Sequence, residues 1–95
     1  MGTRSRPRPA NLSRKLRQIR IALQLSQAEM VRRLGFADSF HVGRISEYES
    51  NMREPSLLIL LAYARVARVH LEDLVDDSIE LPARLPGTII YDRPG

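Results

Sequence analysis

The stretch that most constrains the fold is residues 26–55, SQAEMVRRLGFADSFHVGRISEYESNMREP, which predicts two short helices joined by a turn. Ser26 can cap the first helix, because its hydroxyl oxygen accepts a free backbone N–H group of the first turn. Glu29 suits the positive end of that helix. Gly35 can end the helix in a left-handed conformation. The rest of the chain is organised around this central pair of helices.

The second helix of the pair is predicted to begin near residue 42. Its apolar positions recur in steps of three, at Val42, Ile45 and Tyr48, which is typical of a helix with a narrow buried stripe. Asn51 can end this helix, because asparagine tolerates left-handed backbone better than most residues.

The segment between the two helices, residues 36–41, is irregular. An exposed Phe36 or Phe40 would be unfavourable, so at least one of them is expected to pack against the core. The candidates for capping the following helix are Asp38, Ser39 and His41.

A further helix is predicted before the pair, over residues 12–24. Its apolar residues step by four, three and four and share one face: Leu12, Leu16, Ile19 and Leu23. Asn11 or Ser13 can cap this helix. Arg14, Lys15 and Arg17 fall off the apolar face and are interpreted as either solvated surface or phosphate contacts.

One further helix is predicted from the pattern after the pair, over residues 56–69. Pro55 and Ser56 stand at its start, and it is apolar nearly all round, which indicates a helix that is deeply buried or shared between subunits.

Charge is divided unevenly along the 95 residues. Up to Gly35 there are nine Arg or Lys residues and one acid, a net charge of +8, whereas the remainder has six Arg residues and ten acids, a net charge of −4. A basic half is the electrostatic signature of a phosphate-binding surface, and the acidic half should face away from a polyanion.

The chain has no cysteine, no signal-peptide pattern and no apolar run long enough for a membrane, so we expect a cytoplasmic protein without a membrane partner.

Three short motifs, LSQAEMVRRLG, ISEYESNMREPS and LEDL, resemble the phage-repressor and Cro-type (XRE-like) helix-turn-helix family. The resemblance spans residues 12–74 and implies an all-α, compact five-helix lambda-repressor-like domain that binds double-stranded DNA through the second helix of the central pair. We expect a basic arm in residues 1–10, the DNA-binding domain in residues 11–77 and a C-terminal extension in residues 78–95, which serves as a dimerisation or packing segment.

The resemblance also assigns roles to single residues. Gln27 and Arg53 match family positions that contact the DNA backbone, and Arg20 with Glu49 matches a structural ion pair between the first and third helices. Arg68 stands where the family commonly has a helix-ending glycine, so its backbone is expected to be strained or rebuilt. Val31 replaces the usual alanine at the close approach of the central helices.

Base reading is expected from the third helix. The family's base-contacting positions fall on Val42, Gly43 and Glu47, of which Val42 suits a thymine methyl group and Glu47 a cytosine amino group. Arg44 is the strongest candidate, because a guanidinium can bond guanine bidentately, with a phosphate contact as its alternative. Ser46 is a weaker candidate on the same arc. Arg14 and Arg17 complete the predicted DNA-binding residues.

A short run, residues 88–91 (TIIY), is prone to form β-structure and follows Gly87. Exposed Ile-Ile-Tyr would be hard to explain, so the run is expected to pack on the core or to pair with another chain, including a second copy.

Catalysis has little support, because no metal-binding, nucleophile or phosphate-loop pattern surrounds the two histidines. We therefore predict no enzyme, no cofactor and no metal site. The predicted function is a sequence-specific transcription regulator, acting as a repressor or as an activator, that binds double-stranded DNA as a homodimer. The alternative is an antitoxin-like module that binds a partner protein and only secondarily binds DNA.

Overall fold

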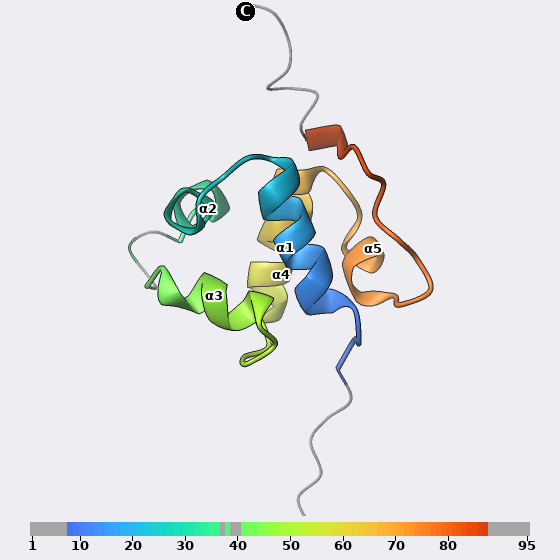
Figure 1. The fold of residues 1–95 in the computed structure, drawn as a ribbon, viewed down its shortest axis with the longest axis horizontal. Helices are drawn as coiled ribbons and strands as arrows, with labels where there is room; N and C mark the ends of the chain where they lie inside the picture. Colours follow the sequence, from blue (N-terminus) through green and yellow to red (C-terminus); the bar gives the residue numbers. More distant parts are fainter. Residues whose placement is uncertain (1–7, 37, 39–40, 88–95) are drawn as a thin grey trace, which may run out of the picture.

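The computed structural model describes residues 8–36, 38 and 41–87. In these residues the regular structure is helical, in the order α1 (Leu12–Ala22), α2 (Gln27–Leu34), α3 (Gly43–Glu49), α4 (Leu57–Ala67) and α5 (Leu71–Val75). In Figure 1, α1 lies in front of α4, with α2 and α3 on one side and α5 on the other. The predicted all-α class with five helices is confirmed.

Helix ends follow the capping signals of the sequence. The Ser26 hydroxyl accepts the Glu29 backbone N–H at 3.0 Å, and the Glu29 carboxylate accepts the Ser26 N–H at 2.7 Å, which makes a complete capping box at the start of α2. Gly35 ends α2 with φ of 91°. Ser56 caps α4 by accepting the Ile59 N–H at 3.3 Å. These local signals fix where the central helices begin and end.

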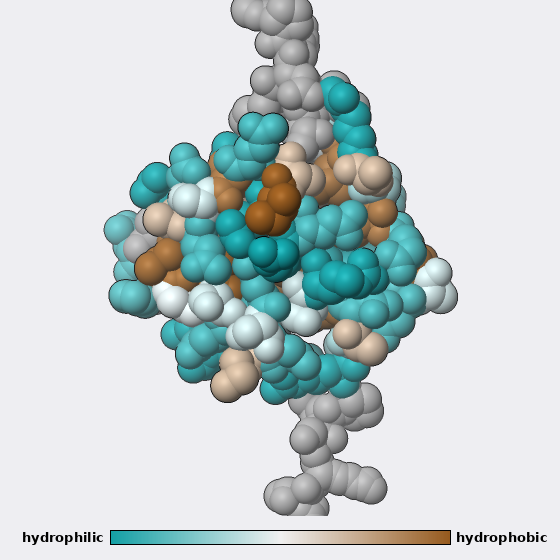
Figure 2. Space-filling view, in the orientation of Figure 1, coloured by the Kyte–Doolittle hydropathy of each residue, from teal (hydrophilic) through white to brown (hydrophobic). Residues whose placement is uncertain are grey.

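The core joins apolar side chains from every helix. Its buried members are Leu12, Leu16, Ile19, Met30, Val31, Leu34, Ile45, Tyr48, Ile59, Leu60, Tyr63, Ala64, Ala67, Leu74, Leu81 and Leu85. Phe36 is partly buried and packs against this cluster, as the sequence predicted for one of the two phenylalanines. The surface on the side of α1 is accordingly mostly hydrophilic (Figure 2).

Residues 76–87 continue the packed unit beyond α5. They run along the side of the domain next to α5 and end near the C-terminal end of α4 (Figure 1). Leu81 and Leu85 are 6% and 0% exposed, so this segment closes the core. A Cβ atom at Gly87 would lie 2.5 Å from the Val66 carbonyl oxygen, so only glycine allows the chain to approach α4 this closely.

Lys15 corrects the sequence interpretation. It was expected on the surface or at a phosphate, but its side chain is fully buried. The ammonium group donates hydrogen bonds to the backbone carbonyls of Asp73 at 2.8 Å and Asp76 at 2.9 Å. It therefore satisfies carbonyl groups at the C-terminal end of α5, where a cation is favoured. Both interpretations of Lys15, surface residue and phosphate contact, are wrong.

The residues that lead into α1 are held by Asp77, which follows α5. Asn11 occupies the N-cap position but makes no side-chain capping bond. Instead, the Asp77 carboxylate accepts the backbone N–H groups of Ala10 at 2.8 Å and Asn11 at 3.0 Å. These bonds lower the pKa of Asp77. Asp77 thus fixes the two residues that lead into α1, and the side-chain cap predicted for this helix is not observed at its N-cap residue, Asn11.

Within residues 8–36, 38 and 41–87, three residues other than glycine have left-handed backbone. Asn51 follows the end of α3 with φ of 63°, as predicted. Arg68 ends α4 with φ of 61°, so the strained alternative predicted for this position is the one observed. Gln24 has φ of 60° and lies in the turn between α1 and α2. The predictions for residues 1–7, Ser39, Phe40 and the run 88–91 fall outside the described residues.

Candidate DNA-binding surface

α3 lies at the edge of the domain, held there by its apolar stripe (Figure 1). Ile45 and Tyr48 are buried against the other helices, with exposed fractions of 0% and 3%. The predicted base-reading residues occupy the remaining arc and are exposed or half-buried: Val42, Gly43, Arg44, Ser46 and Glu47. A short helix exposed in this way has the dimensions to enter the major groove of duplex DNA.

The beginning of α3 is held by His41, one of the three candidates for its cap. The Nδ1 atom of His41 accepts the Gly43 backbone N–H at 3.0 Å. A Cβ atom at Gly43 would lie 3.2 Å from that same Nδ1 atom, which is a tight contact. Glycine therefore allows the imidazole to close over the first turn, and Gly43 has a structural role in addition to its predicted place in the groove.

A small charged cluster covers the end of α3. The Glu47 carboxylate accepts a hydrogen bond from Arg53 Nε at 2.8 Å and lies 4.0 Å from Arg44 Nε. The three side chains are between 38% and 51% exposed. Exposed ion pairs contribute little to stability, so a DNA phosphate can exchange with the carboxylate at low cost.

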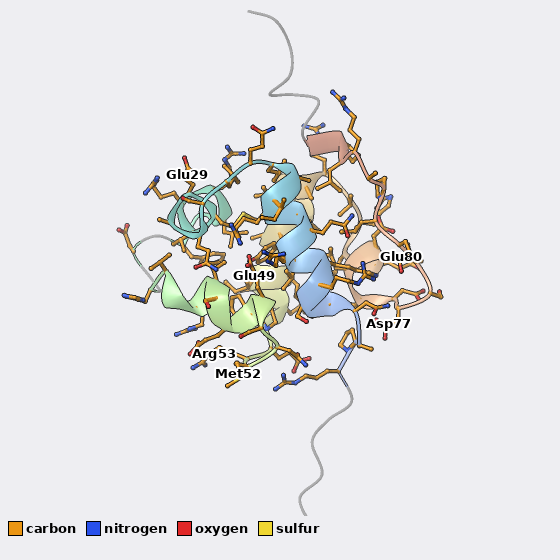
Figure 3. All side chains as sticks on the ribbon, viewed as in Figure 1. Glu29, Glu49, Met52, Arg53, Asp77 and Glu80 are labelled. Atoms are coloured by element: carbon orange, nitrogen blue, oxygen red, sulfur yellow. The ribbon has the colours of Figure 1, made fainter. Side chains whose placement is uncertain are left out.

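The turn after α3 fixes the position of Arg53. The Glu47 carbonyl accepts the backbone N–H groups of Met52 at 2.8 Å and Arg53 at 3.3 Å. Both side chains project from this turn beside the end of α3 (Figure 3). The structure therefore brings Arg53 together with Arg44 and Glu47.

Arg8 joins the same surface from the start of the chain. Its guanidinium donates to the carbonyl oxygen of Asn51 at 3.3 Å and to the Asn51 side-chain oxygen at 3.4 Å. Sequence reasoning placed Arg8 only in the basic arm and missed this neighbourhood. No local pattern could have revealed it, because 43 positions separate the two residues.

The first turn of α2 contains Gln27, which is half-buried. Helix N-termini bind phosphate oxygens through free N–H groups and the positive end of the helix dipole. Glu29 lies two residues after Gln27 in the same turn. The hydrogen bonds from Ser26 lower the pKa of Glu29, so its carboxylate keeps its charge in the capping box. α2 packs against α3, so the two predicted DNA-contacting helices form one unit.

Arg20 and Glu49 connect α1 to α3. Arg20 Nε donates to one Glu49 oxygen at 2.7 Å and a terminal nitrogen donates to the other at 2.9 Å. A third bond runs from Arg20 to the Leu25 carbonyl at 3.1 Å. The pair is largely buried, with side chains 13% and 6% exposed, and the bond to Glu49 raises the pKa of Arg20. The bidentate pair thus fixes the orientation of α3 relative to α1.

The structure separates Arg14 from the rest of the predicted site. Arg14 pairs with Glu80 at 3.1 Å. Glu80 and Asp77 lie on the α5 side of α1, away from α3 (Figure 3). Arg17 is exposed on α1. Asp77 and Glu80, two acids of the C-terminal half, therefore face away from α3. Glu47 of the same half lies on α3 itself, so the expectation that the whole acidic half faces away from the predicted DNA-binding helix is wrong.

Within residues 8–36, 38 and 41–87, no group of three or more acidic or histidine side chains could hold a metal ion. None of the helices there has the length and apolar character needed to cross a membrane.

Comparison with known families completes the assignment. The sequence model of the helix-turn-helix family matches residues 16–74, which is more than half of the chain. No curated protein and no solved structure gave a match. The matched region begins inside α1 and ends at Leu74 in α5, so it contains the central pair with α3 as its second helix. The chain belongs to the XRE-like helix-turn-helix family of DNA-binding domains.

Proposed function

We propose that this protein is a sequence-specific regulator of transcription that acts in the cytoplasm as a homodimer on double-stranded DNA. Each copy places α3 in the major groove of one half-site. The observation that carries the proposal is the exposed arc of α3, where Arg44 and Glu47 lie beside Arg53 with an exchangeable ion pair between them.

Within this surface the residues have different tasks. Gln27 at the start of α2 and Arg53 after α3 bind phosphates and set the orientation of the domain. Arg44 and Glu47 read bases, with Val42, Gly43 and Ser46 in close contact with the groove. Arg17 reaches flanking phosphate. Arg14 is omitted from this set, because its guanidinium lies beside Glu80 on the α5 side of the domain, away from α3.

Two exposed apolar side chains support the homodimer. Met52 and Leu57 are 76% and 68% exposed and flank the connection between α3 and α4. A contact there would join two copies close to their recognition helices. Two-fold dimers of this kind bind half-sites about one helical turn of DNA apart.

The division of tasks can be tested with alanine variants in a fluorescence anisotropy assay on duplex DNA. Gln27→Ala and Arg53→Ala should weaken binding to all sequences alike. Arg53→Ala should also reduce the magnitude of the slope of log K against log salt by about 1, whereas Gln27→Ala removes a neutral side chain and should leave that slope unchanged. Arg44→Ala should change the sequence selected from a random pool. Equal weakening on all sequences would instead assign Arg44 to a phosphate.

A matched control for these variants is Arg65→Ala, which removes an exposed arginine from α4. It should leave both the affinity and the salt slope unchanged. If Arg65→Ala lowers affinity as much as Arg53→Ala, binding reflects total charge, and the proposed surface is wrong.

The second candidate function, an antitoxin-like protein-interaction module, is favoured by the exposed Leu57 and Leu58 of α4, at 68% and 67% exposure. Such a module would co-purify with a stoichiometric partner protein. A homodimer that protects an inverted repeat would favour the regulator.

A further inference from the structure

Arg8 is an exposed arginine at the edge of the candidate DNA-binding surface, outside the predicted contact residues. One terminal nitrogen of its guanidinium donates to the backbone carbonyl of Asn51 at 3.3 Å and to the Asn51 side-chain oxygen at 3.4 Å. Asn51 follows the end of α3 and has left-handed backbone, which asparagine tolerates. The residue that follows α3 therefore also holds Arg8.

The backbone that carries Arg8 is fixed from the α5 side as well. The Asp77 carboxylate accepts the backbone N–H groups of Ala10 at 2.8 Å and Asn11 at 3.0 Å. These bonds lower the pKa of Asp77, so the carboxylate keeps its charge at neutral pH. Asn51 holds the Arg8 side chain, and Asp77 holds the chain two residues later. The guanidinium is therefore positioned before any ligand binds.

Arg8 and Arg53 meet at one small cleft. They contribute to its lining together with Pro9, Tyr48 and Asn51, and its volume is about 10 Å³. This is about the smallest space that admits one water molecule, so the chain before α1 lies against the turn after α3. The two segments are at the same end of the domain (Figure 1). Arg8 therefore presents a second guanidinium beside Arg53, the proposed phosphate contact.

The charge of this region favours a phosphate. Arg44 and Arg53 lie beside Glu47, and Glu54 lines the same cleft as Arg8. These three arginines and two glutamates leave a net charge of +1. The contact of Arg8 with Asn51 is to neutral oxygens, so it leaves the positive charge of the guanidinium in place. A guanidinium has five N–H donors in a planar fork, so it can bind a phosphate oxygen while Asn51 holds one of its nitrogens.

On the basis of the proposed DNA-binding function, we propose that Arg8 binds a backbone phosphate of duplex DNA next to the phosphate bound by Arg53. Asn51 is its positioning residue, because it holds the guanidinium beside the end of α3. The contact carries no sequence information and adds affinity on every duplex. It extends the DNA-binding surface from the central pair of helices to the segment before α1.

The test compares the unsubstituted full chain with Arg8→Gln by fluorescence anisotropy, on the duplex recovered by selection and on an unrelated duplex of equal length. Loss of one phosphate contact reduces the magnitude of the slope of log K against log salt by about 0.9. Between about 50 and about 200 mM salt, the affinity advantage of the unsubstituted chain over Arg8→Gln should therefore fall about threefold on both duplexes. Arg8→Lys keeps the charge and should keep the slope.

Arg14→Gln is the matched control, because it removes the same charge from an arginine that pairs with Glu80, away from α3. It should leave the slope unchanged. An unchanged slope for Arg8→Gln would overturn the proposal, and so would an equal reduction for Arg14→Gln, which would show an effect of total charge.

The two duplexes separate this proposal from the proposed function. If selection recovers no common sequence, the sequence-specific regulator fails, while the unrelated duplex still tests whether Arg8 binds a phosphate. If the unsubstituted chain binds neither duplex, both are overturned.

Discussion

Replacing Lys15 with Met should destabilise the domain, because the buried ammonium group satisfies two carbonyl groups of the α5 end. Each hydrogen bond to a charged group contributes about 1.5–3 kcal/mol. Met has a similar length and avoids the desolvation cost of a buried ammonium, which offsets part of this loss. We therefore expect a net decrease of about 2 kcal/mol in the free energy of unfolding.

A loss of this size is a large fraction of the free energy of unfolding of a small domain. A domain of 95 residues has an unfolding free energy of about 5–14 kcal/mol, and 1 kcal/mol shifts the midpoint of thermal unfolding by about 4–8 °C. Urea and thermal unfolding followed by circular dichroism measure both quantities. Lys15→Met should therefore unfold about 8–16 °C below the unsubstituted protein.

Arg17→Met is the matched control, because it removes a cation from an exposed position of the same helix. Its effect should stay within about 0.5 kcal/mol. If Lys15→Met is as stable as Arg17→Met, the α5 carbonyl groups do not depend on Lys15, and the reasoning is refuted.

Three further predictions concern stability. Arg20→Met should lower the free energy of unfolding by about 3–5 kcal/mol, because it leaves Glu49 buried without its partner, and urea unfolding measures this loss. The double variant Arg20→Met with Glu49→Met should recover part of that loss. If the losses of the two single variants simply add in the double variant, the two residues are not coupled. Arg68→Gly should raise the unfolding free energy by about 1 kcal/mol by relieving left-handed backbone, whereas a decrease would show that the arginine side chain matters more. The pKa of Asp77 is lowered from its ordinary value of 3.8, so its contribution is present above that value and is lost as the pH falls through the lowered pKa. Asp77→Asn should therefore be less stable at neutral pH and should lose less stability on acidification, and parallel pH curves would rule out a contribution of the bonds from Ala10 and Asn11.

Local signals in the sequence were sufficient for most of the helical architecture. The capping box of Ser26 and Glu29, the left-handed Gly35 and the left-handed Asn51 each depend on residues within a few positions. The pair of Arg20 and Glu49 is distant in sequence, and its prediction came from resemblance to the family. These features fix the central pair of helices and the orientation of α3.

Other features depend on contacts that no local pattern encodes. Lys15 falls off the apolar face of α1, so periodicity assigned it to the surface, but the end of α5 packs there and offers carbonyl groups. Asp77 holds the residues that lead into α1 across 66 or 67 positions of sequence. Leu81 and Leu85 complete the core from an irregular segment without helical spacing. In each case the partner is created by tertiary packing.

The sequence predicted which residues form the candidate site, but it did not predict the ion pairs between them. The residues of α3 were identified from the motif, but the ion pairs of Glu47 with Arg53 and Arg44 required the turn geometry after α3. Arg8 came to the same surface through Asn51. Arg44 and Arg53 beside Glu47, and Arg8 beside Asn51, follow from how the chain turns after the end of α3.

The most direct test of the central claim is selection of duplexes from a random-sequence DNA pool by the purified full chain at moderate salt, where nonspecific binding is weak. The proposed regulator should recover an inverted repeat with half-sites about one helical turn apart. If folded protein recovers no common sequence, α3 does not read DNA as proposed.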